Sequence, residues 1–322
     1  MIQYMNELSS KKINELLNLY DLKDNMSSPK VTGDPRFEQL KLAFSDYAET
    51  LSADSYCVLG IDILGYSQLD FKKQAYIPVL FDLLLKETIR QALESEYLVF
   101  NKYKETSIRE RFIPTGDGGF FLLESPFEGL LFALNFAAML HLYNSHSFYP
   151  GIRYALDSVR VRYCLTFDKV YKYERNYYGP AIINNHRIMS RDKLDRCLLD
   201  ANTQEWFLEK INGIESLRVF TLQDIINKLS YQVVKLPEGK NYYQSAIIVK
   251  DFRDGIVPSI LNLATQKIGT VKAKQQSLDV YNLFMQLAKS YSDESNPILR
   301  DNYVINFGNL NTAGLSDEPY SK

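Results

Sequence analysis

Residues 56–67 read YCVLGIDILGYS, and this stretch decides how the chain is interpreted. The run from Tyr56 to Ile63 is apolar and leads into a glycine-containing turn, which predicts a buried β-strand. Asp62 stands near the end of that strand. An acidic residue in this place lies close to the core instead of on a solvated face, which makes Asp62 a candidate functional residue.

A second acidic residue occupies a similar place. Residues 112–121, FIPTGDGGFF, predict two short strands around a glycine-rich turn that contains Asp117. Two carboxylates about 5 Å apart repel by roughly 3 kcal/mol at an effective dielectric constant of about 20. A divalent cation removes this repulsion, and carboxylates suit Mg²⁺ or Mn²⁺, which also bind substrate phosphates. The pair predicts a metal site for a nucleotide, although each aspartate alone is more simply a turn former.

Apolar runs alternate with helical patterns outward from these two segments. The predicted strands are Tyr56–Ile63, Glu110–Pro114, Phe120–Leu123, Val159–Tyr171 and Asp195–Leu199. The predicted helices are Met5–Leu22, Arg36–Leu51, Lys72–Glu94, Pro126–His141, Gly179–Lys193 and Thr203–Ile211. This interleaving predicts an α/β or α+β sheet domain.

The C-terminal hundred residues give weaker signals. They predict one strand, two helices and a loose polar end, at Ser245–Val249, Ser259–Thr265, Ser277–Tyr291 and 292–322. The expected organisation has three parts: a helical prefix (1–54), a sheet domain (55–222) and an appended accessory module with a flexible end (223–322).

Composition excludes several classes of protein. The 322 residues are 46% hydrophobic and 24% charged with a net charge of -2, which is typical of a folded globular chain and predicts no nucleic-acid partner. The longest apolar stretch, Gly129–Tyr143, is too short to span a membrane. The N-terminus lacks the pattern of a signal peptide, and the three cysteines form no CxxC pair, so a cytoplasmic location is expected.

Four segments follow one another along residues 55–222: Gly60–Ser67, Thr115–Gly118, Val161–Val170, and Tyr178–Ile182 with Arg187. In this order they resemble the two metal motifs, the central strand and a helix start of the class III nucleotidyl cyclases. Two glycine positions of the central strand are Cys164 and Asp168 here. The resemblance implies an α+β fold with a ferredoxin-like βαββαβ core and helices on one side of the sheet.

The resemblance also implies a site and a reaction. Asp62 and Asp117 would hold two Mn²⁺ or Mg²⁺ ions, with the backbone carbonyl of Ile63 assisting. One ion would activate the ribose 3′-hydroxyl and the other would neutralise the triphosphate, so that pyrophosphate leaves. Arg187 matches the arginine that meets charge on the transferred phosphoryl group. Because the family builds its sites between two catalytic domains, a homodimer is implied.

The positions that read the base depart from the purine-using members of the family. Ile113 and Asn176 stand where ATP-using members have a lysine and an aspartate. In ATP-using members this lysine binds adenine. Its replacement by isoleucine removes a buried hydrogen bond and changes the discrimination between bases by orders of magnitude. With bulky neighbours such as Tyr66 and Tyr178, Ile113 would narrow the slot for a base.

This composition resembles the pyrimidine cyclases of bacterial anti-phage signalling, the Pycsar systems, which make cyclic UMP or cyclic CMP. UTP or CTP is then the expected substrate, with the choice between them left open. Two alternatives stand beside this reading: a divergent purine cyclase, and a catalytically silent fold that binds a nucleotide or a partner. The second is raised by Ile183, which occupies the usual place of an asparagine while Asn184 and Asn185 are displaced. The presence of Asp62, Asp117 and Arg187 favours an enzyme over the catalytically silent fold.

Overall fold

The computed structural model describes residues 10–19, 35–50, 54–146, 148–173, 176–212, 260–272, 277–293 and 296–315, and every structural statement concerns these residues. The chain divides into two compact units, each treated separately below. The first comprises Met1–Ser55 with Asp168–Pro180, and the second comprises Tyr56–Phe167 with Ala181–Lys322.

The first unit contains the two helices predicted for the N-terminal prefix. They are α1 (Ser10–Leu19) and α2 (Pro35–Thr50). A small antiparallel hairpin joins β5 (Tyr171–Tyr173) to β6 (Asn176–Tyr178). The Tyr171 and Tyr178 rings stack across this hairpin with centroids 5.9 Å apart, a spacing typical of favourable aromatic pairs.

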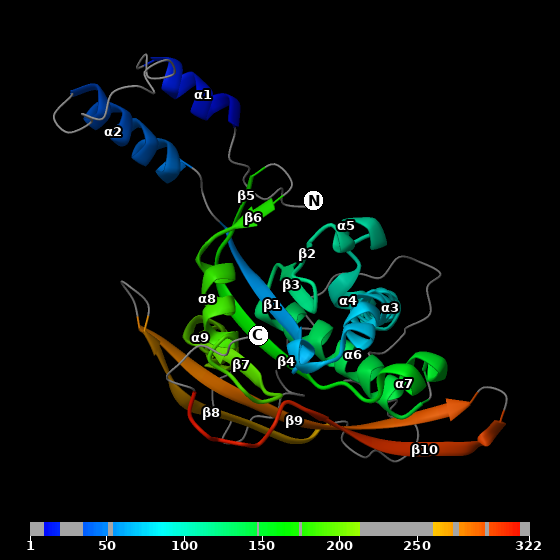
Figure 1. Ribbon diagram of the computed structural model, residues 1–322. Coiled ribbons are helices and arrows are strands. Elements are labelled where there is room, and N and C mark those ends of the chain that lie inside the picture. Colours follow the sequence, from blue (N-terminus) through cyan, green and yellow to red (C-terminus); the bar gives the residue numbers. More distant parts are fainter. Residues whose placement is uncertain are drawn as a thin grey trace, which may run out of the picture. The chain divides into compact units, whose positions relative to one another are not determined.

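The second unit is an α+β domain built on one sheet (Figure 1). Its strands are β1 (Ser55–Ile63), β2 (Phe112–Pro114), β3 (Gly118–Leu123), β4 (Val161–Lys169), β7 (Cys197–Asp200), β8 (Ile260–Lys272), β9 (Ser277–Asp293) and β10 (Asn296–Phe307). Its helices are η1 (Tyr66–Gln68), α3 (Phe71–Ser95), α4 (Tyr97–Phe100), α5 (Glu105–Arg109), α6 (Pro126–Asn144), α7 (Pro150–Leu156), α8 (Pro180–Met189) and α9 (Ala201–Asn212).

The first four strands have the order β4-β1-β3-β2, with α3 between β1 and β2 and α6 between β3 and β4. This is the connectivity of a ferredoxin-like βαββαβ core, and it confirms the predicted fold class. The predicted hairpin around the GDGG turn is also confirmed, since β2 and β3 pair antiparallel with Ile113 opposite Phe120.

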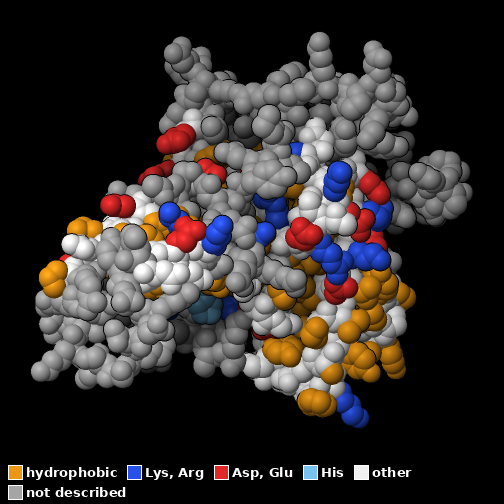
Figure 2. Space-filling view, turned by 90° about the horizontal axis from the view of Figure 1, so that it is seen from above, with side chains coloured by type: hydrophobic (Ala, Val, Ile, Leu, Met, Phe, Trp, Pro, Cys, Tyr) orange, Lys and Arg blue, Asp and Glu red, His pale blue; other side chains and the backbone are white. Residues whose placement is uncertain are grey.

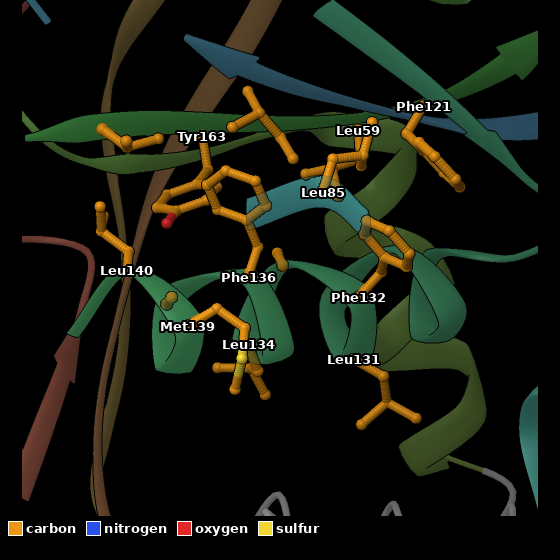
Figure 3. Close-up of a cluster of buried hydrophobic side chains, with 14 of the residues drawn as sticks. Leu59, Leu85, Phe121, Leu131, Phe132, Leu134, Phe136, Met139, Leu140 and Tyr163 are labelled. Atoms are coloured by element: carbon orange, nitrogen blue, oxygen red, sulfur yellow. The ribbon is translucent and has the colours of Figure 1, made fainter. Parts of the chain in front are cut away.

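One face of the sheet packs against α3, α6 and α9. α6 is buried almost all round, which agrees with its nearly continuous apolar sequence. Figure 3 shows Phe132 and Phe136 of α6 pointing toward the sheet and Leu131 pointing away from it. The Phe121 and Phe132 rings stack with centroids 4.3 Å apart. Ser125 caps α6 by accepting a hydrogen bond from the Glu128 amide, so the helix begins immediately after the β3 strand.

The opposite face of the sheet packs against α8. Ile188 and Met189 of α8 lie in a second apolar cluster with Cys164 and Leu198 of the strands. The buried Asn185 amide donates to the carbonyl oxygens of Val58 (2.8 Å) and Cys164 (2.9 Å). The expected arrangement of helices on one side therefore holds for α3, α6 and α9, while α8 lies on the other side.

The C-terminal strands extend the same sheet. β9 pairs antiparallel with β7, with Cys197 opposite Leu283, and it also pairs with β8 and β10. The predictions of helices over Ser259–Thr265 and Ser277–Tyr291 are therefore wrong. Within the predicted loose end, Asn296–Phe307 forms β10, and residues 316–322 lie outside the described residues. The predicted strand Ser245–Val249 lies outside the described residues.

The error at β9 has a physical reason. Residues 282–285 are all buried, so both faces of this strand are covered and its sequence shows no polar–apolar alternation. A strand of this kind cannot be separated from a buried helix by periodicity alone.

The structure also bears on two questions raised by composition, the presence of a membrane span and the state of the cysteines. In the described parts of the chain, no helix has the length and apolarity that crossing a membrane requires. The three cysteines are free thiols, and burial raises their pKa values well above the usual range.

Candidate active site

Asp62 lies near the end of β1, and Asp117 directly precedes β3, so both residues are at the same end of the β1–β3 pair. Asp62 is directly opposite Gly118 in the register, and the amide of Ile63 donates to the carbonyl oxygen of Asp117 over 3.1 Å. Both aspartates are buried, with only 4% and 5% of their surfaces exposed. The pairing of β1 with β3 therefore brings together two motifs that are far apart in the sequence.

The close approach of the two strands depends on Gly118. A Cβ atom at this position would meet the carbonyl oxygen of Ile61 at 2.0 Å and the Cα of Asp62 at 2.9 Å. Backbone atoms cannot move aside as flexible side chains can, so only glycine allows β3 to lie this close to β1. Gly118 is therefore required for the packing of β3 against β1, in addition to its place in the predicted turn.

Arg162, the second residue of β4, forms an ion pair with Asp62. Its Nε and Nη2 atoms lie 2.7 and 2.6 Å from Oδ2 of Asp62, and the Arg162 residue is 2% exposed. Its Nη1 donates to the carbonyl oxygens of Met189 (3.0 Å) and Asp192 (2.5 Å). Arg162 is a functional candidate that the motif analysis missed.

The ion pair changes the electrostatic argument for a metal. Over Asp62, Asp117 and Arg162 the charges sum to one negative charge, not two, so burial of the aspartates does not by itself demand a cation. A carboxylate has about four lone-pair sites, so an arginine on one oxygen leaves capacity for a metal. The oxygen donors fit Mg²⁺ or Mn²⁺.

A cation at this place would need ligands beyond protein side chains. Among the residues that the structure describes, no group of three or more His, Cys, Asp or Glu side chains is arranged to hold a metal ion. Two carboxylates with a backbone carbonyl leave about half of an octahedral shell to water and substrate oxygens, and Mg²⁺ usually keeps several waters and binds substrate phosphates.

The other predicted site residues of the second unit are distributed around this strand pair. Tyr66 is half-buried in η1, directly after β1, and Ile113 is half-buried on β2, the neighbour of β3. Arg187 is half-buried on α8, where its carbonyl oxygen accepts a hydrogen bond from the Ser190 hydroxyl. Their roles in binding and catalysis stay predictions.

Two predicted base-reading residues belong to the first unit. Asn176 and Tyr178 are exposed residues of β6, two positions apart in the β5–β6 hairpin. Their role in binding a base likewise stays a prediction.

The asparagines displaced from the helix motif are buried. Ile183, at the motif position, is 50% exposed. Asn185 donates to two strand carbonyls and to the Thr166 hydroxyl (3.2 Å), so its amide holds β1, β4 and α8 together. Asn185 therefore has a structural task, and Asn184 is buried beside it on the same helix.

Arg162 could have been found from the sequence. It lies between Val161 and Tyr163 in a strand that is otherwise apolar up to Leu165. Arginine is almost never fully buried unless it is paired. An arginine in a predicted core strand is therefore a signal to look for a buried carboxylate, and Asp62 was already singled out as one.

Of the comparisons with known proteins, the one with solved structures gives matches. A scan of protein-family models finds no match, and no curated protein matches the sequence. Among solved structures, the chain is similar to an adenylate/guanylate cyclase/hydrolase from Silicibacter pomeroyi at 9% identity, with 72% of this chain and 96% of that chain covered and a TM-score of 0.37.

Two other solved structures have similar values. One is the guanylate cyclase domain of RhGC from Catenaria anguillulae in complex with GTP, at 12% identity, with 72% of this chain and 96% of that chain covered and a TM-score of 0.36. The other is the adenylyl cyclase CyaB from P. aeruginosa, at 11% identity, with 72% and 94% covered and a TM-score of 0.36.

Proposed function

We propose that this protein is a metal-dependent nucleotidyl cyclase, which converts a nucleoside triphosphate into its 3′,5′-cyclic monophosphate and pyrophosphate. The observation that carries the proposal is the pairing of β1 with β3, which brings the buried Asp62 and Asp117 to neighbouring positions at one strand end. These are the two acidic residues of the motifs that resemble the metal motifs of class III cyclases.

In the proposed reaction the ribose 3′-oxygen forms a bond to the α-phosphorus. The bond from this phosphorus to the oxygen bridging the α- and β-phosphates breaks, pyrophosphate leaves, and the proton of the hydroxyl passes to solvent. Mg²⁺ or Mn²⁺ bound here would supply Lewis-acid activation of the hydroxyl and neutralise phosphate charge.

The residues of the chain have distinct roles in this proposal. Asp62 and Asp117, with the carbonyl of Ile63, would supply oxygen ligands. Arg162 would hold Asp62 in a fixed orientation, because its guanidinium binds one carboxylate oxygen and is itself fixed by two backbone carbonyls. Arg187 would donate to the oxygens of the transferred phosphoryl group, with its planar set of N–H donors.

The substrate in this proposal is a pyrimidine triphosphate, UTP or CTP. Ile113 has no polar atom in its side chain to read the edge of a purine, and its neighbour on β3 is the bulky Phe120. Tyr66 would contribute stacking to a smaller base. The roles of Asn176 and Tyr178 in reading the base are implied only by the resemblance. A role in bacterial anti-phage signalling is implied only by the resemblance and stays a prediction.

A homodimer with sites between two copies is part of the proposal. α3 carries exposed apolar side chains at Phe71, Tyr76 and Val79. Figure 2 shows hydrophobic side chains gathered on one part of the face that it displays. Exposed apolar patches commonly mark interfaces between proteins. A second copy of the chain would cover such a surface.

A second candidate function is nucleotide binding without turnover. It is favoured by the Arg162–Asp62 ion pair, which compensates one carboxylate without a metal, and by the structural use of Asn185. In this alternative the two aspartates stabilise the end of the β1–β3 pair, and a nucleotide binds without being cyclised.

The deciding experiment incubates the purified chain with Mn²⁺ and each of the four labelled ribonucleoside triphosphates, with separation of the products by chromatography. We expect cyclic UMP or cyclic CMP with pyrophosphate. Asp117→Asn should lower the rate by more than about 100-fold, since even outer partners of metal ligands are worth about 10- to 100-fold. Asp82→Asn is the matched control, because Asp82 is exposed on α3 and pairs with Arg109.

The outcomes separate the candidates. Cyclic product from ATP or GTP alone would refute the pyrimidine preference and leave a cyclase. Absence of cyclic product from all four nucleotides would refute catalysis, and nucleotide binding that is unchanged in Asp117→Asn would then support the second candidate.

A further inference from the structure

A continuous chain of polar contacts leads away from Asp62 on the side of Arg162. The Nη1 atom of Arg162 donates to the carbonyl oxygens of Met189 and Asp192. Met189 is the last residue of α8, and Asp192 lies in the connection between α8 and β7. The orientation of the guanidinium that holds Asp62 thus depends on the backbone of this connection.

The side chain of Asp192 continues the chain of contacts to Arg196. Nε and Nη2 of Arg196 lie 3.0 and 2.6 Å from Oδ1 of Asp192, and each of these two residues is 1% exposed. Arg196 is among the largest fully buried side chains in the described part of the molecule. Its carbonyl oxygen also accepts from the amide of Tyr163, the neighbour of Arg162 in β4.

Arg196 reaches the segment that follows β10. Its Nη1 donates to the carbonyl oxygens of Asn311 (3.1 Å) and Ala313 (2.6 Å). A buried guanidinium has five N–H donors to satisfy, and here the C-terminal backbone satisfies one of its nitrogens. Residues 310–314 are exposed. The contact with Arg196 is therefore made by the backbone of this segment and not by apolar side chains of these residues.

Asparagine side chains hold this C-terminal segment in place. Asn309 donates from Nδ2 to Oδ1 of Asp195 over 2.9 Å and accepts from the amide of Asn311 over 2.8 Å. Asn311 accepts in turn from the amide of Ala313 over 2.9 Å. These local bonds fix the turn in which two carbonyl oxygens face Arg196.

We propose that the segment Asn309–Ala313 is a positioning element for Asp62, acting through Arg196, Asp192 and Arg162. The proposal rests on the proposed function in one respect, that Asp62 is a metal ligand. The segment lies outside the four motifs that resemble the cyclases, and about 250 positions separate it from Asp62 in the sequence (309 - 62 = 247). Its integrity would then control how well the site binds a cation.

The test uses the full chain with Asn309→Ala and Asn311→Ala together, which removes the side chains that hold the turn. Asn306→Ala is the matched control, because Asn306 is an exposed asparagine nearby on β10 whose bond goes to Gln286. Mn²⁺ binding without nucleotide is measured by electron paramagnetic resonance. Amide hydrogen exchange is measured over residues 56–66 and 189–196.

We expect the double variant to weaken Mn²⁺ binding by up to about tenfold, the lower end of the effect of disturbing the outer partner of a metal ligand, which here is Arg162. Exchange over residues 56–66 should become faster, and the control should change neither quantity. The single variant Asn311→Asp, with Asn309 unchanged, keeps an acceptor for the Ala313 amide. It should therefore bind Mn²⁺ as tightly as the wild-type chain. If the double variant fails to fold, Asn311→Ala alone is compared with Asn311→Asp.

Unchanged Mn²⁺ affinity together with unchanged exchange over residues 56–66 would overturn the proposal. A wild-type chain that binds Mn²⁺ but cyclises no nucleotide would overturn the proposed function while leaving this inference standing. If the wild-type chain binds no Mn²⁺, metal binding is refuted, and the exchange measurement decides whether the C-terminal segment orders the end of β1.

Discussion

Replacing Arg162 by methionine should strongly destabilise the second unit. Methionine keeps much of the apolar length of the arginine but leaves the Asp62 carboxylate buried without its guanidinium partner. Breaking a buried ion pair by removing one partner costs about 3–5 kcal/mol. The carbonyl oxygens of Met189 and Asp192 also lose a donor, at about 1 kcal/mol each if water does not replace it. We expect a loss of about 5 kcal/mol in the free energy of unfolding.

A matched control and a double variant sharpen this prediction. Arg160 lies two residues earlier, its side chain is 70% exposed, and it lies 3.9 Å from Asp195, so Arg160→Met should change stability by less than about 1 kcal/mol. Asp62→Leu combined with Arg162→Met replaces the pair by apolar groups, which is often close to neutral, and should recover most of the loss.

The assay is urea unfolding followed by circular dichroism and by fluorescence of Trp206, the single tryptophan of the chain. The reasoning would be refuted if Arg162→Met were as stable as Arg160→Met. It would also be refuted if the double variant were no more stable than Arg162→Met, because the loss would then not come from an uncompensated carboxylate.

Three further predictions concern the packing around the site. Gly60→Ala should destabilise the fold by about 1–3 kcal/mol in thermal unfolding, because its Cβ would lie 2.2 Å from Oδ1 of Asn185 and 2.4 Å from the Met189 sulfur; an unchanged melting temperature would contradict this. Burial raises the pKa of all three thiols, so iodoacetamide at pH 8.5 should modify them only after unfolding, and rapid labelling of the native protein would be the opposite result. Glu128→Ala should cost about 2–4 kcal/mol in urea unfolding, because the buried Glu128 accepts from Tyr103 and Lys102, and a loss near zero would argue against a structural role.

The alternation of apolar runs, helical patterns and glycine-rich turns was sufficient to predict an α/β or α+β sheet domain, and the βαββαβ order of its core was implied by the resemblance of the motifs. The sequence was also sufficient to place Asp62 and Asp117 at strand ends. An arginine in an apolar strand signals a buried carboxylate partner, but the sequence could not decide between Asp62 and Asp117, because the contact of Arg162 with Asp62 joins residues 100 positions apart and depends on the β4-β1 pairing.

The C-terminal strands illustrate a different limit. β9 contains Leu, Met, Gln, Ala and Lys, which are good helix formers, and its buried centre shows no alternation of polar and apolar residues. Only its long-range pairing with β7, β8 and β10 decides in favour of a strand. Local propensity was overridden by tertiary context, as is common for sheets.

The pairing of β9 with β7 has a practical consequence for anyone who expresses part of this protein. A fragment that stops after α9 would look complete by its motifs, yet β7 would then be the outermost strand, with the N–H and C=O groups of Cys197–Asp200 facing water. Because these four residues are apolar or buried in the intact chain, such a rim would template association with other chains. Recombinant fragments should therefore retain the C-terminal hairpins to remain monodisperse.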